Sequence, residues 1–267
     1  MSQPDPCAVF PSKTLASSVD DLNRHPEWFR DPSRSDEDNA GPAVIVRDDF
    51  YDDPMRIREI LLAMEYRPYL APSPQIVGAD TCALFAGQPV AWSSSVIEVF
   101  RGQPVRNPHK GKRYNPSEIR ERIAAVLPPG EDIARETWDT LGDGWNGAGH
   151  LMNANWKTGQ GSIHTHYKKG DVVPRGWSGV VYLSPDAPPS SGTSVWREKK
   201  TGACVAAFGV KFDTAVEGFE LAALVENRFN RLVLFRENVL HRAEHGFGEG
   251  NTARLTQTFF FNSRRRG

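Results

Sequence analysis

The sequence predicts a mainly β fold with flanking helices, of the double-stranded β-helix type shared by jelly rolls and cupins. Its 267 residues include 23 Gly, 20 Pro and 10% aromatic residues, a composition typical of short strands joined by tight turns. Helical patterns fall mostly in the first half of the chain, and short apolar runs separated by turn-forming residues begin at about residue 148. Helices followed by a series of antiparallel-type strands indicate a jelly roll with helices around it.

The composition divides the chain into three segments. Residues 1–42 are expected to form an N-terminal arm that is partly flexible, because the stretch 31–39 is polar and has almost nothing to bury. Residues 43–262 are expected to form a single jelly-roll domain, which begins at the apolar run 43–46. Residues 263–267 are a basic tail.

Two helices are predicted in the N-terminal half of this domain. Asp53 is a suitable N-cap and Pro54 a suitable first residue for the first helix. The second helix follows a capping-box pattern over 115–118 and ends at 128–130, where two prolines precede a glycine. Their apolar positions recur at helical spacing, at Ile57, Ile60, Leu61 and Met64 in the first and at Ile119, Ile123, Val126 and Leu127 in the second. Each helix therefore has one face to pack on a sheet.

Strands are expected mainly in the second half of the chain. Their ranges are 95–101, 150–156, 161–167, 178–183, 193–197, 231–236 and 254–261. Turns rich in Pro, Ser and Gly separate several of them, most clearly at 184–192. The stretch 216–229 is interpreted as one further helix.

Charge and cysteine content exclude several classes of protein. The 32 Lys and Arg against 33 Asp and Glu give a formal net charge of −1, which disfavours dedicated nucleic-acid binding. Three widely spaced cysteines form neither a disulfide framework nor a cysteine zinc site. Because no apolar run is long enough for a membrane span and the N-terminus lacks a signal pattern, the sequence predicts a soluble cytoplasmic protein.

A pair of histidines is the most informative chemical motif. His164 and His166 are two residues apart on an expected strand, so both imidazoles project from the same face, as a metal ligand pair requires. Ile163 suits the opposite face. His241 follows the apolar strand 231–236 and can supply a third ligand from a later strand of the same barrel. On spacing alone, surface or core histidines remain an alternative to a metal site.

Arg254 begins the last apolar strand. A buried guanidinium needs an anionic partner, and its planar fork matches a carboxylate. Thr256 and Thr258 share the face of Arg254 on this strand. An exposed cation at the strand end is the alternative interpretation of Arg254.

Together these features resemble a known family. The order is a strand with a histidine pair, a Gly-Thr strand, a distal histidine, and an arginine on the next strand. It is similar to that of the 2-oxoglutarate and iron(II)-dependent oxygenases. The stretches 44–54, 179–186 and 192–196 resemble a subgroup of uncharacterised bacterial oxygenase-like proteins, and the likeness covers roughly residues 43–262.

The resemblance implies roles for individual residues. His164 matches the first metal ligand and His241 the distal ligand, while Arg254 matches the arginine that binds the far carboxylate of 2-oxoglutarate. Thr256, Tyr182 and Asn153 are further candidates to contact the co-substrate. For Tyr182 a core position with a satisfied hydroxyl is the alternative, and for Asn153 a contact within the sheet or a turn.

His166 departs from the family pattern, because it stands where the family has an acid. Three interpretations follow. His166 binds and gives a three-histidine site, which is the preferred interpretation; or the position is left open for a halide; or Asp171 supplies the acid. His245 is an alternative to His241 as the distal ligand, and His150 is a candidate to support the ligands.

The expected function is hydroxylation of a small molecule or amino-acid-like substrate, with O2 as oxidant and release of succinate and CO2. The implied cofactors are Fe(II) and 2-oxoglutarate. A zinc hydrolase or lyase with three histidines, and a cupin-like binding module without catalysis, are the alternatives. Loops at 66–92, 102–114 and 167–176 are expected to determine specificity.

Overall fold

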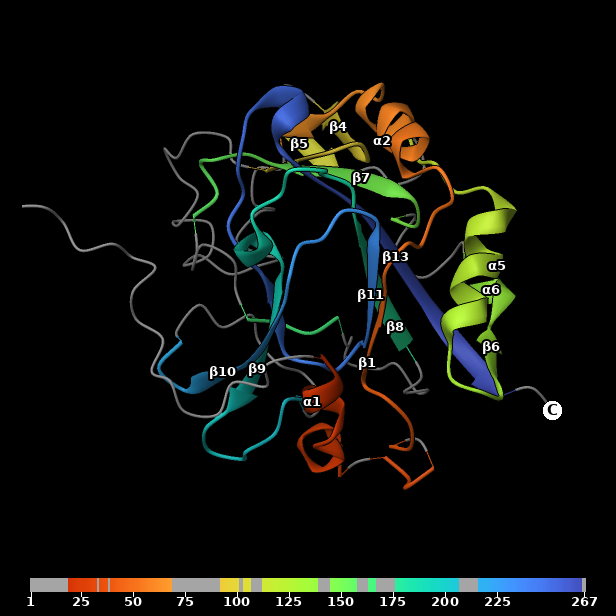
Figure 1. The fold of residues 1–267 in the computed structure, drawn as a ribbon, viewed down its shortest axis with the longest axis vertical. Coiled ribbons are helices and arrows are strands. Elements are labelled where there is room, and N and C mark those ends of the chain that lie inside the picture. The colour runs from red at the N-terminus through yellow and green to blue at the C-terminus, as the bar shows by residue number, and fades with distance from the viewer. Residues whose placement is uncertain are drawn as a thin grey trace, which may run out of the picture.

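The computed structural model describes residues 19–32, 34–37, 39–68, 92–100, 103–106, 112–138, 145–157, 163–166, 176–206 and 216–265. Two antiparallel sheets dominate it (Figure 1). The large, eight-stranded sheet has the order β1 (Val44–Arg47), β11 (Arg231–Arg236), β8 (Gly176–Tyr182), β13 (Arg254–Arg265), β7 (Ala148–Met152), β3 (Trp92–Ser94) and β2 (Arg67–Pro68), with β6 (Glu131–Ile133) also paired to β13. The small, three-stranded sheet has the order β10 (Phe219–Val225), β9 (Thr193–Glu198) and β12 (His241–Ala243).

The remaining elements lie around these sheets. A separate hairpin joins β4 (Ile97–Phe100) to β5 (Gln103–Arg106). The α-helices are α1 (Val19–Asn23), α2 (Pro54–Leu62), α5 (Ser117–Val126) and α6 (Arg135–Trp138), and the 3-10 helices are η1 (Pro26–Phe29), η3 (Pro189–Ser191) and η4 (Gly250–Thr252). No helix in the described ranges is long and apolar enough to cross a membrane.

The strand order confirms the predicted double-stranded β-helix. From β7 to β13 the chain passes repeatedly between the two sheets, so that β7, β13, β8 and β11 are neighbours in the large sheet although they are distant in sequence. In the small sheet, the 163–166 segment extends the order beyond β12 through an antiparallel bridge between His164 and His241. This alternation is the jelly-roll connection.

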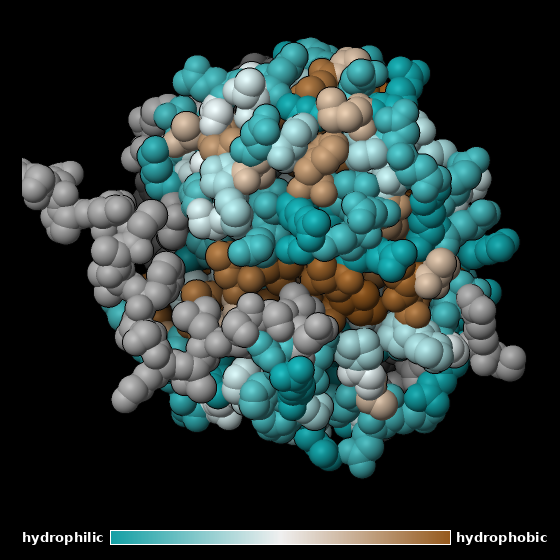
Figure 2. Space-filling model, in the orientation of Figure 1, coloured by the Kyte–Doolittle hydropathy of each residue, from teal (hydrophilic) through white to brown (hydrophobic). Residues whose placement is uncertain are grey.

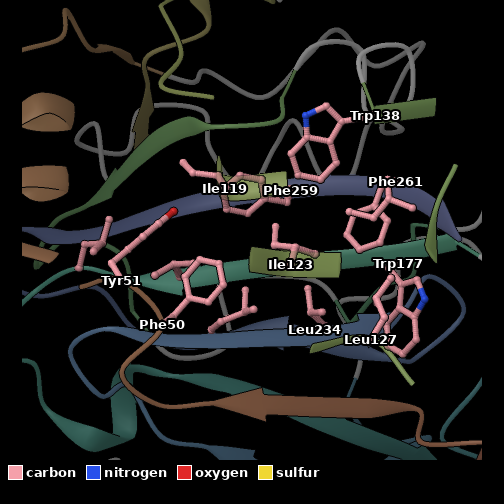
Figure 3. Close-up of a cluster of buried hydrophobic side chains, with 14 of the residues drawn as sticks. Phe50, Tyr51, Ile119, Ile123, Leu127, Trp138, Trp177, Leu234, Phe259 and Phe261 are labelled. Atoms are coloured by element: carbon pink, nitrogen blue, oxygen red, sulfur yellow. The ribbon is translucent and has the colours of Figure 1, made fainter. Parts of the chain in front are cut away.

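The outer face of the large sheet is covered by helices. Ile119 and Ile123 of α5 and Leu61 of α2 are buried in one hydrophobic cluster with residues of the sheet, among them Trp177 and Phe259. Figure 3 shows Ile119 and Ile123 facing the rings of Phe50, Phe259 and Phe261. Each helix thus buries the apolar face that its spacing predicted.

The inner face of the large sheet faces the small sheet. Tyr182, Val233 and Phe235 of the large sheet form a second buried cluster with Val195 and Ala223 of the small sheet. Because neighbouring residues of a strand point to opposite faces, β8 and β11 contribute to both clusters. Figure 2 shows a band of hydrophobic residues across this side of the molecule, in the region where Figure 1 draws these strands.

Helix starts agree only in part with the sequence prediction. Asp53 caps α2, since its side chain accepts a hydrogen bond from the backbone N–H of Arg56 at 3.0 Å. The predicted capping box before α5 is wrong: Pro116 is the N-cap and no side chain caps the helix. Proline at this position leaves Asn115 one residue too early to act as the cap.

The predicted helix over 216–229 is also wrong. This segment contains β10, which pairs with β9 and is interrupted by a register shift between Leu221 and Ala223. Pairing with β9 buries Ala222, Ala223 and Val225 against the other sheet, so tertiary packing overrides the local helical preference.

Residues 19–42 pack on the domain where the structure describes them. Leu22 is fully buried in the cluster between the two sheets. Asp31 and Arg34, from the stretch thought to have nothing to bury, form an ion pair of 3.2 Å with side chains that are 0% and 3% exposed. A paired charge is tolerated inside a protein where a single charge is not.

Candidate metal centre

The histidine pair of the sequence lies at the edge of the small sheet, against the strand that carries His241. The backbone N–H of His164 donates to the carbonyl of His241 at 3.0 Å, and the reverse hydrogen bond has the same length. Ile163 is 1% exposed and belongs to a separate hydrophobic cluster, and Thr165 is also buried. This alternation leaves His164 and His166 on one side of the segment, as predicted.

The three predicted histidines converge. One ring nitrogen from each of His164, His166 and His241 lies within 4.8 Å of the others. The Nε2 atoms of His166 and His241 are 3.1 Å apart, and the ring centroids of His164 and His241 are 4.4 Å apart. No other group of three potential ligands of this kind was found in the described ranges.

The surroundings of His241 prepare it to be a ligand. Its Nδ1–H donates to the carbonyl oxygen of Val239 at 2.9 Å, which leaves the lone pair on Nε2, the atom that faces His166. Burial lowers the pKa of His241 well below its usual value, and the charges of His164 and His166 lower it further, although the bond to Val239 opposes them. The imidazole is therefore neutral at pH 7.

These side chains fit a transition-metal ion. Two nitrogens that share a metal at about 2.1 Å are separated by roughly 3 Å, and the pair of His166 and His241 already has this separation. Imidazole nitrogen is a good ligand for iron as well as zinc. The three residues would hold the ion on the inner side of the barrel and leave its other positions open to exogenous ligands.

Phenyl rings from the large sheet surround the histidines. The ring of His166 lies 4.9 Å from that of Phe260 on β13 and 6.3 Å from that of Phe235 on β11. Phe235 is also 4.1 Å from His241. Both phenylalanines are opposite Ser178 in the strand register, one on each side of β8. The histidines thus face the inner surface of the large sheet.

Arg254 is buried on this same inner surface. It is 2% exposed, its Nε donates to the carbonyl of Ser191 at 2.7 Å, and its Nη2 donates to that of Gly192 at 3.2 Å. Nη1 contacts the sulfur of Met152 at 2.7 Å. These contacts engage three of the five guanidinium N–H donors, and Tyr182 is a further hydrogen-bond partner of the side chain.

The charge of Arg254 is not balanced by a carboxylate bound to it within the described part of the chain. Glu244, whose charge acts on it, is hydrogen-bonded to Arg242. Burial lowers the pKa of Arg254, with Tyr182 and Glu244 opposing this effect, and an arginine stays protonated at neutral pH. The alternative interpretation of Arg254 as an exposed cation at the strand end therefore does not hold, because the side chain is buried.

Strand β9 links Arg254 to the histidines. Arg254 binds the carbonyl of Gly192, which directly precedes β9, whereas His241 pairs with Val195 of the same strand. Three residues of a strand span about 10 Å. The backbone positions that Arg254 and His241 contact are therefore close together on one strand.

The other residues predicted to contact a co-substrate lie in different surroundings. Thr256 is buried between Tyr182 and His150 in the sheet register, on the same face as Arg254. The hydroxyl of Tyr182 donates to Thr193 at 2.7 Å, so it already joins the two sheets. Asn153 follows the end of β7 in a turn, and its side chain accepts a hydrogen bond from the N–H of Asn155.

The alternative ligands are placed as follows. Asp171 lies outside the described residues, as do 69–91, 102, 107–111 and 167–175 of the loops expected to determine specificity. His245 is not part of the histidine cluster and lies 3.4 Å from the hydroxyl of Ser190. His150 is buried and lies 3.0 Å from the hydroxyl of Thr258.

The aromatic surroundings of the site were not predicted from the sequence. Strand alternation from Arg254 could have placed Phe260 on the inner face, since the two are six residues apart. The rings of Trp92 and Trp145 lie 5.7 and 4.8 Å from that of His150, and no motif indicated them. Trp196 packs in the hydrophobic cluster of Ile163, and Trp177 packs in the outer core.

No family model and no curated protein sequence matches the chain. Among solved structures it is similar to HygX from Streptomyces hygroscopicus with nickel, 2-oxoglutarate and hygromycin B bound, at 14% identity and a TM-score of 0.42, over 82% of each chain. It is also similar to the epimerase SnoN in complex with Fe3+, alpha ketoglutarate and nogalamycin RO, at 12% identity and a TM-score of 0.42, over 84% of this chain and 82% of SnoN.

A prolyl-4-hydroxylase from Pseudomonas putida is 16% identical, with a TM-score of 0.36 over 84% of this chain and 94% of the other. Likenesses with TM-scores below 0.5 do not decide what this chain does. The proposed function is therefore argued from the side chains of this protein.

Proposed function

We propose that the protein is a non-haem iron enzyme of the 2-oxoglutarate-dependent oxygenase class, with His164, His166 and His241 as metal ligands. The observation that carries this proposal is the placing of Arg254. Its guanidinium is buried with no carboxylate bound to it among the described residues, and it lies in the same barrel as the histidine cluster. A metal at one end and a carboxylate-binding cation at the other suit a co-substrate that is both a metal ligand and a dicarboxylate.

Each side chain has a distinct part in this proposal. The histidines hold the iron, and the hydrogen bond from His241 to Val239 fixes the orientation of one of them. Arg254 binds the far carboxylate of 2-oxoglutarate, and Thr256 adds a hydroxyl on the same face. When bound, iron and 2-oxoglutarate supply the oxidising chemistry with O2, and the chain supplies position and electrostatics.

Three neutral ligands change the charge of the centre. In a site of two histidines and one carboxylate, the carboxylate lowers the net charge of the metal centre by one unit. His166 as a neutral ligand would leave that charge unchanged. The centre therefore keeps the full charge of the cation, which favours anionic exogenous ligands such as the keto-acid end of 2-oxoglutarate. Hydroxylation of a small-molecule or amino-acid-like substrate, with release of succinate and CO2, is the proposed outcome.

A zinc hydrolase or lyase is the second candidate, and the observation that favours it is the ligand set itself. Three histidines with open positions are also a catalytic zinc site. Arg254 separates the two candidates, because zinc-bound water needs no carboxylate clamp at a distance from the metal.

The test is binding of 2-oxoglutarate to nickel(II)-loaded protein by calorimetry, which needs no substrate. We expect nickel(II) to bind, 2-oxoglutarate to bind only after it, and succinate to form when iron(II), ascorbate and O2 are supplied. Nickel(II) binding without 2-oxoglutarate binding would favour the zinc candidate. Absence of binding by both nickel(II) and zinc(II), with no change on His164→Ala, would favour a binding module without catalysis.

A further inference from the structure

Ser178 stands out among the buried serines of the protein. Six others are buried in the described residues, and the hydroxyl of each makes a hydrogen bond: Ser94, Ser95, Ser184, Ser191, Ser194 and Ser263. Ser178 is 1% exposed, and its Oγ has no hydrogen-bond partner among the described residues. A buried hydroxyl without a partner costs about 1–3 kcal/mol relative to a bonded one.

The position of Ser178 explains what could bind it. It lies on the inner face of β8, directly opposite Phe235 on one side and Phe260 on the other. The rings of both phenylalanines contact the ring of His166, and Phe235 also contacts that of His241. The small hydroxyl side chain is thus between two large rings that reach the histidines, and it faces the same interior.

The chemistry of the centre supplies the missing partner. Three histidines leave positions on a bound metal that exogenous ligands can fill, and oxygen atoms of water or carboxylate are ligands of this kind. Phe235 and Phe260 offer such an oxygen no hydrogen bond. Ser178 is the polar group between them, and a hydroxyl can donate to a carboxylate or accept from coordinated water.

We propose that Ser178 is the hydrogen-bond partner of an oxygen ligand held at the three-histidine centre. The inference rests on the proposed metal centre and adds a positioning group that the sequence did not indicate. Without metal and ligand the hydroxyl is buried and has no partner in the part of the chain that the structure describes. With them it is satisfied, so binding of the oxygen ligand removes a local cost.

The test is the Ser178→Ala variant of the full chain, compared with wild type in two measurements. Calorimetry gives the dissociation constant of nickel(II), and then that of 2-oxoglutarate for the nickel(II)-loaded protein. Thermal unfolding gives the stability of the metal-free protein. We expect about tenfold weaker binding of one of these two probes, with a Tm of the metal-free protein that is unchanged or higher. Ser178→Thr, which retains the hydroxyl, should restore binding.

The probe that loses affinity identifies the ligand: nickel(II) alone indicates coordinated water, and 2-oxoglutarate indicates a carboxylate oxygen. Ser263→Ala is the matched control, because that hydroxyl bonds to Glu131 and receives the indole N–H of Trp177. It should lower the Tm of the metal-free protein and leave both dissociation constants unchanged.

Two results would overturn the inference without touching the proposed function. In the first, wild type and Ser178→Ala bind nickel(II) and 2-oxoglutarate equally well, which shows that the hydroxyl contacts no oxygen ligand of the metal. A metal-free Tm of Ser178→Ala as low as that of Ser263→Ala shows that the hydroxyl already has a protein partner. Wild type that binds neither nickel(II) nor zinc(II) removes the metal centre and this inference with it.

Discussion

The Nε2 atom of His166 lies 3.1 Å from the Nε2 atom of His241. The two residues belong to different segments of the small sheet, and the antiparallel bridge between His164 and His241 brings them together. Two imidazole nitrogens at this separation can share one proton, and a single cation can instead bind a lone pair from each. This spacing supports the proposal that His166 is itself a ligand of the three-histidine centre.

Replacement of His166 by alanine should therefore abolish tight metal binding. We expect at least about a hundredfold loss of nickel(II) affinity, since even loss of a group that only supports a ligand costs 10–100-fold. His166→Asp should retain the metal, because a carboxylate is also a good ligand for iron and nickel. Calorimetric titration with nickel(II) measures both variants.

His245→Ala is the control, since His245 lies outside the cluster. Unchanged affinity of His166→Ala, together with a loss in His245→Ala, would show that the ligand set is wrong.

Arg254→Lys should separate charge from geometry at the other end of the proposed site. Lysine keeps the positive charge but lacks the planar fork. We expect binding of 2-oxoglutarate to nickel(II)-loaded protein to weaken by at least about tenfold, while nickel(II) affinity stays the same. Calorimetry on the loaded protein measures the first and a metal titration the second.

Arg58→Lys provides a comparison, because Arg58 also donates to backbone carbonyls but belongs to α2, which packs on the outer face of the large sheet. It should leave both constants unchanged. Undiminished 2-oxoglutarate binding by Arg254→Lys would mean that the guanidinium only holds the backbone of Ser191 and Gly192.

Strand alternation made much of this site predictable. Alternate residues of a strand point to the same face, which predicted that His164 and His166 share a face and that Arg254 and Thr256 do so too. This prediction needs no knowledge of which strands pair. The N-cap at Asp53 was also predictable, because capping depends only on residues close to it in the sequence. By contrast, the contact of Phe235 and Phe260 with His166 depends on the register of β11, β8 and β13, which single-strand patterns do not contain. The prediction of a helix over 216–229 was wrong for the same reason, because β10 in this segment is a strand through its pairing with β9.

Gly192 should not tolerate a side chain. A Cβ atom at this position would collide with the carbonyl oxygen of Val225 and come within 2.8 Å of the N–H of Asn227. Because the carbonyl of Gly192 also binds Arg254, Gly192→Ala should both destabilise the protein, by about 3 kcal/mol, and weaken 2-oxoglutarate binding. Chemical denaturation and calorimetry measure the two effects.

Gly202→Ala is the matched variant, since no atom lies within 4 Å of a Cβ built there, although its φ of +73° favours glycine. It should cost about 1 kcal/mol and leave binding unchanged. Equal stability of Gly192→Ala and wild type would mean that the turn before β9 rearranges freely.

Glu131 should make stability depend on pH. Its carboxylate lies 2.7 Å from Nη2 of Arg236 and accepts hydrogen bonds from Ser263 and Trp177. Burial raises the pKa of Glu131, but Arg236 and these hydrogen bonds together outweigh burial and leave the pKa lowered. A carboxyl whose pKa is lower in the folded state than in the unfolded state stabilises the protein above the unfolded pKa, about 4.3. This stabilisation disappears as pH falls through the folded value.

Glu131→Gln should thus cost about 2 kcal/mol at pH 7, and the difference from wild type should shrink as the pH falls below about 4. Thermal unfolding of both proteins between pH 7 and 3 measures this. Asp36→Asn is the control, because the pair of Arg30 and Asp36 is exposed, at 65% and 86%, and exposed pairs contribute little. A difference between Glu131→Gln and wild type that is constant over this range would mean that Glu131 acts through its shape and neutral hydrogen bonds. The charge of Arg236 would then be balanced elsewhere.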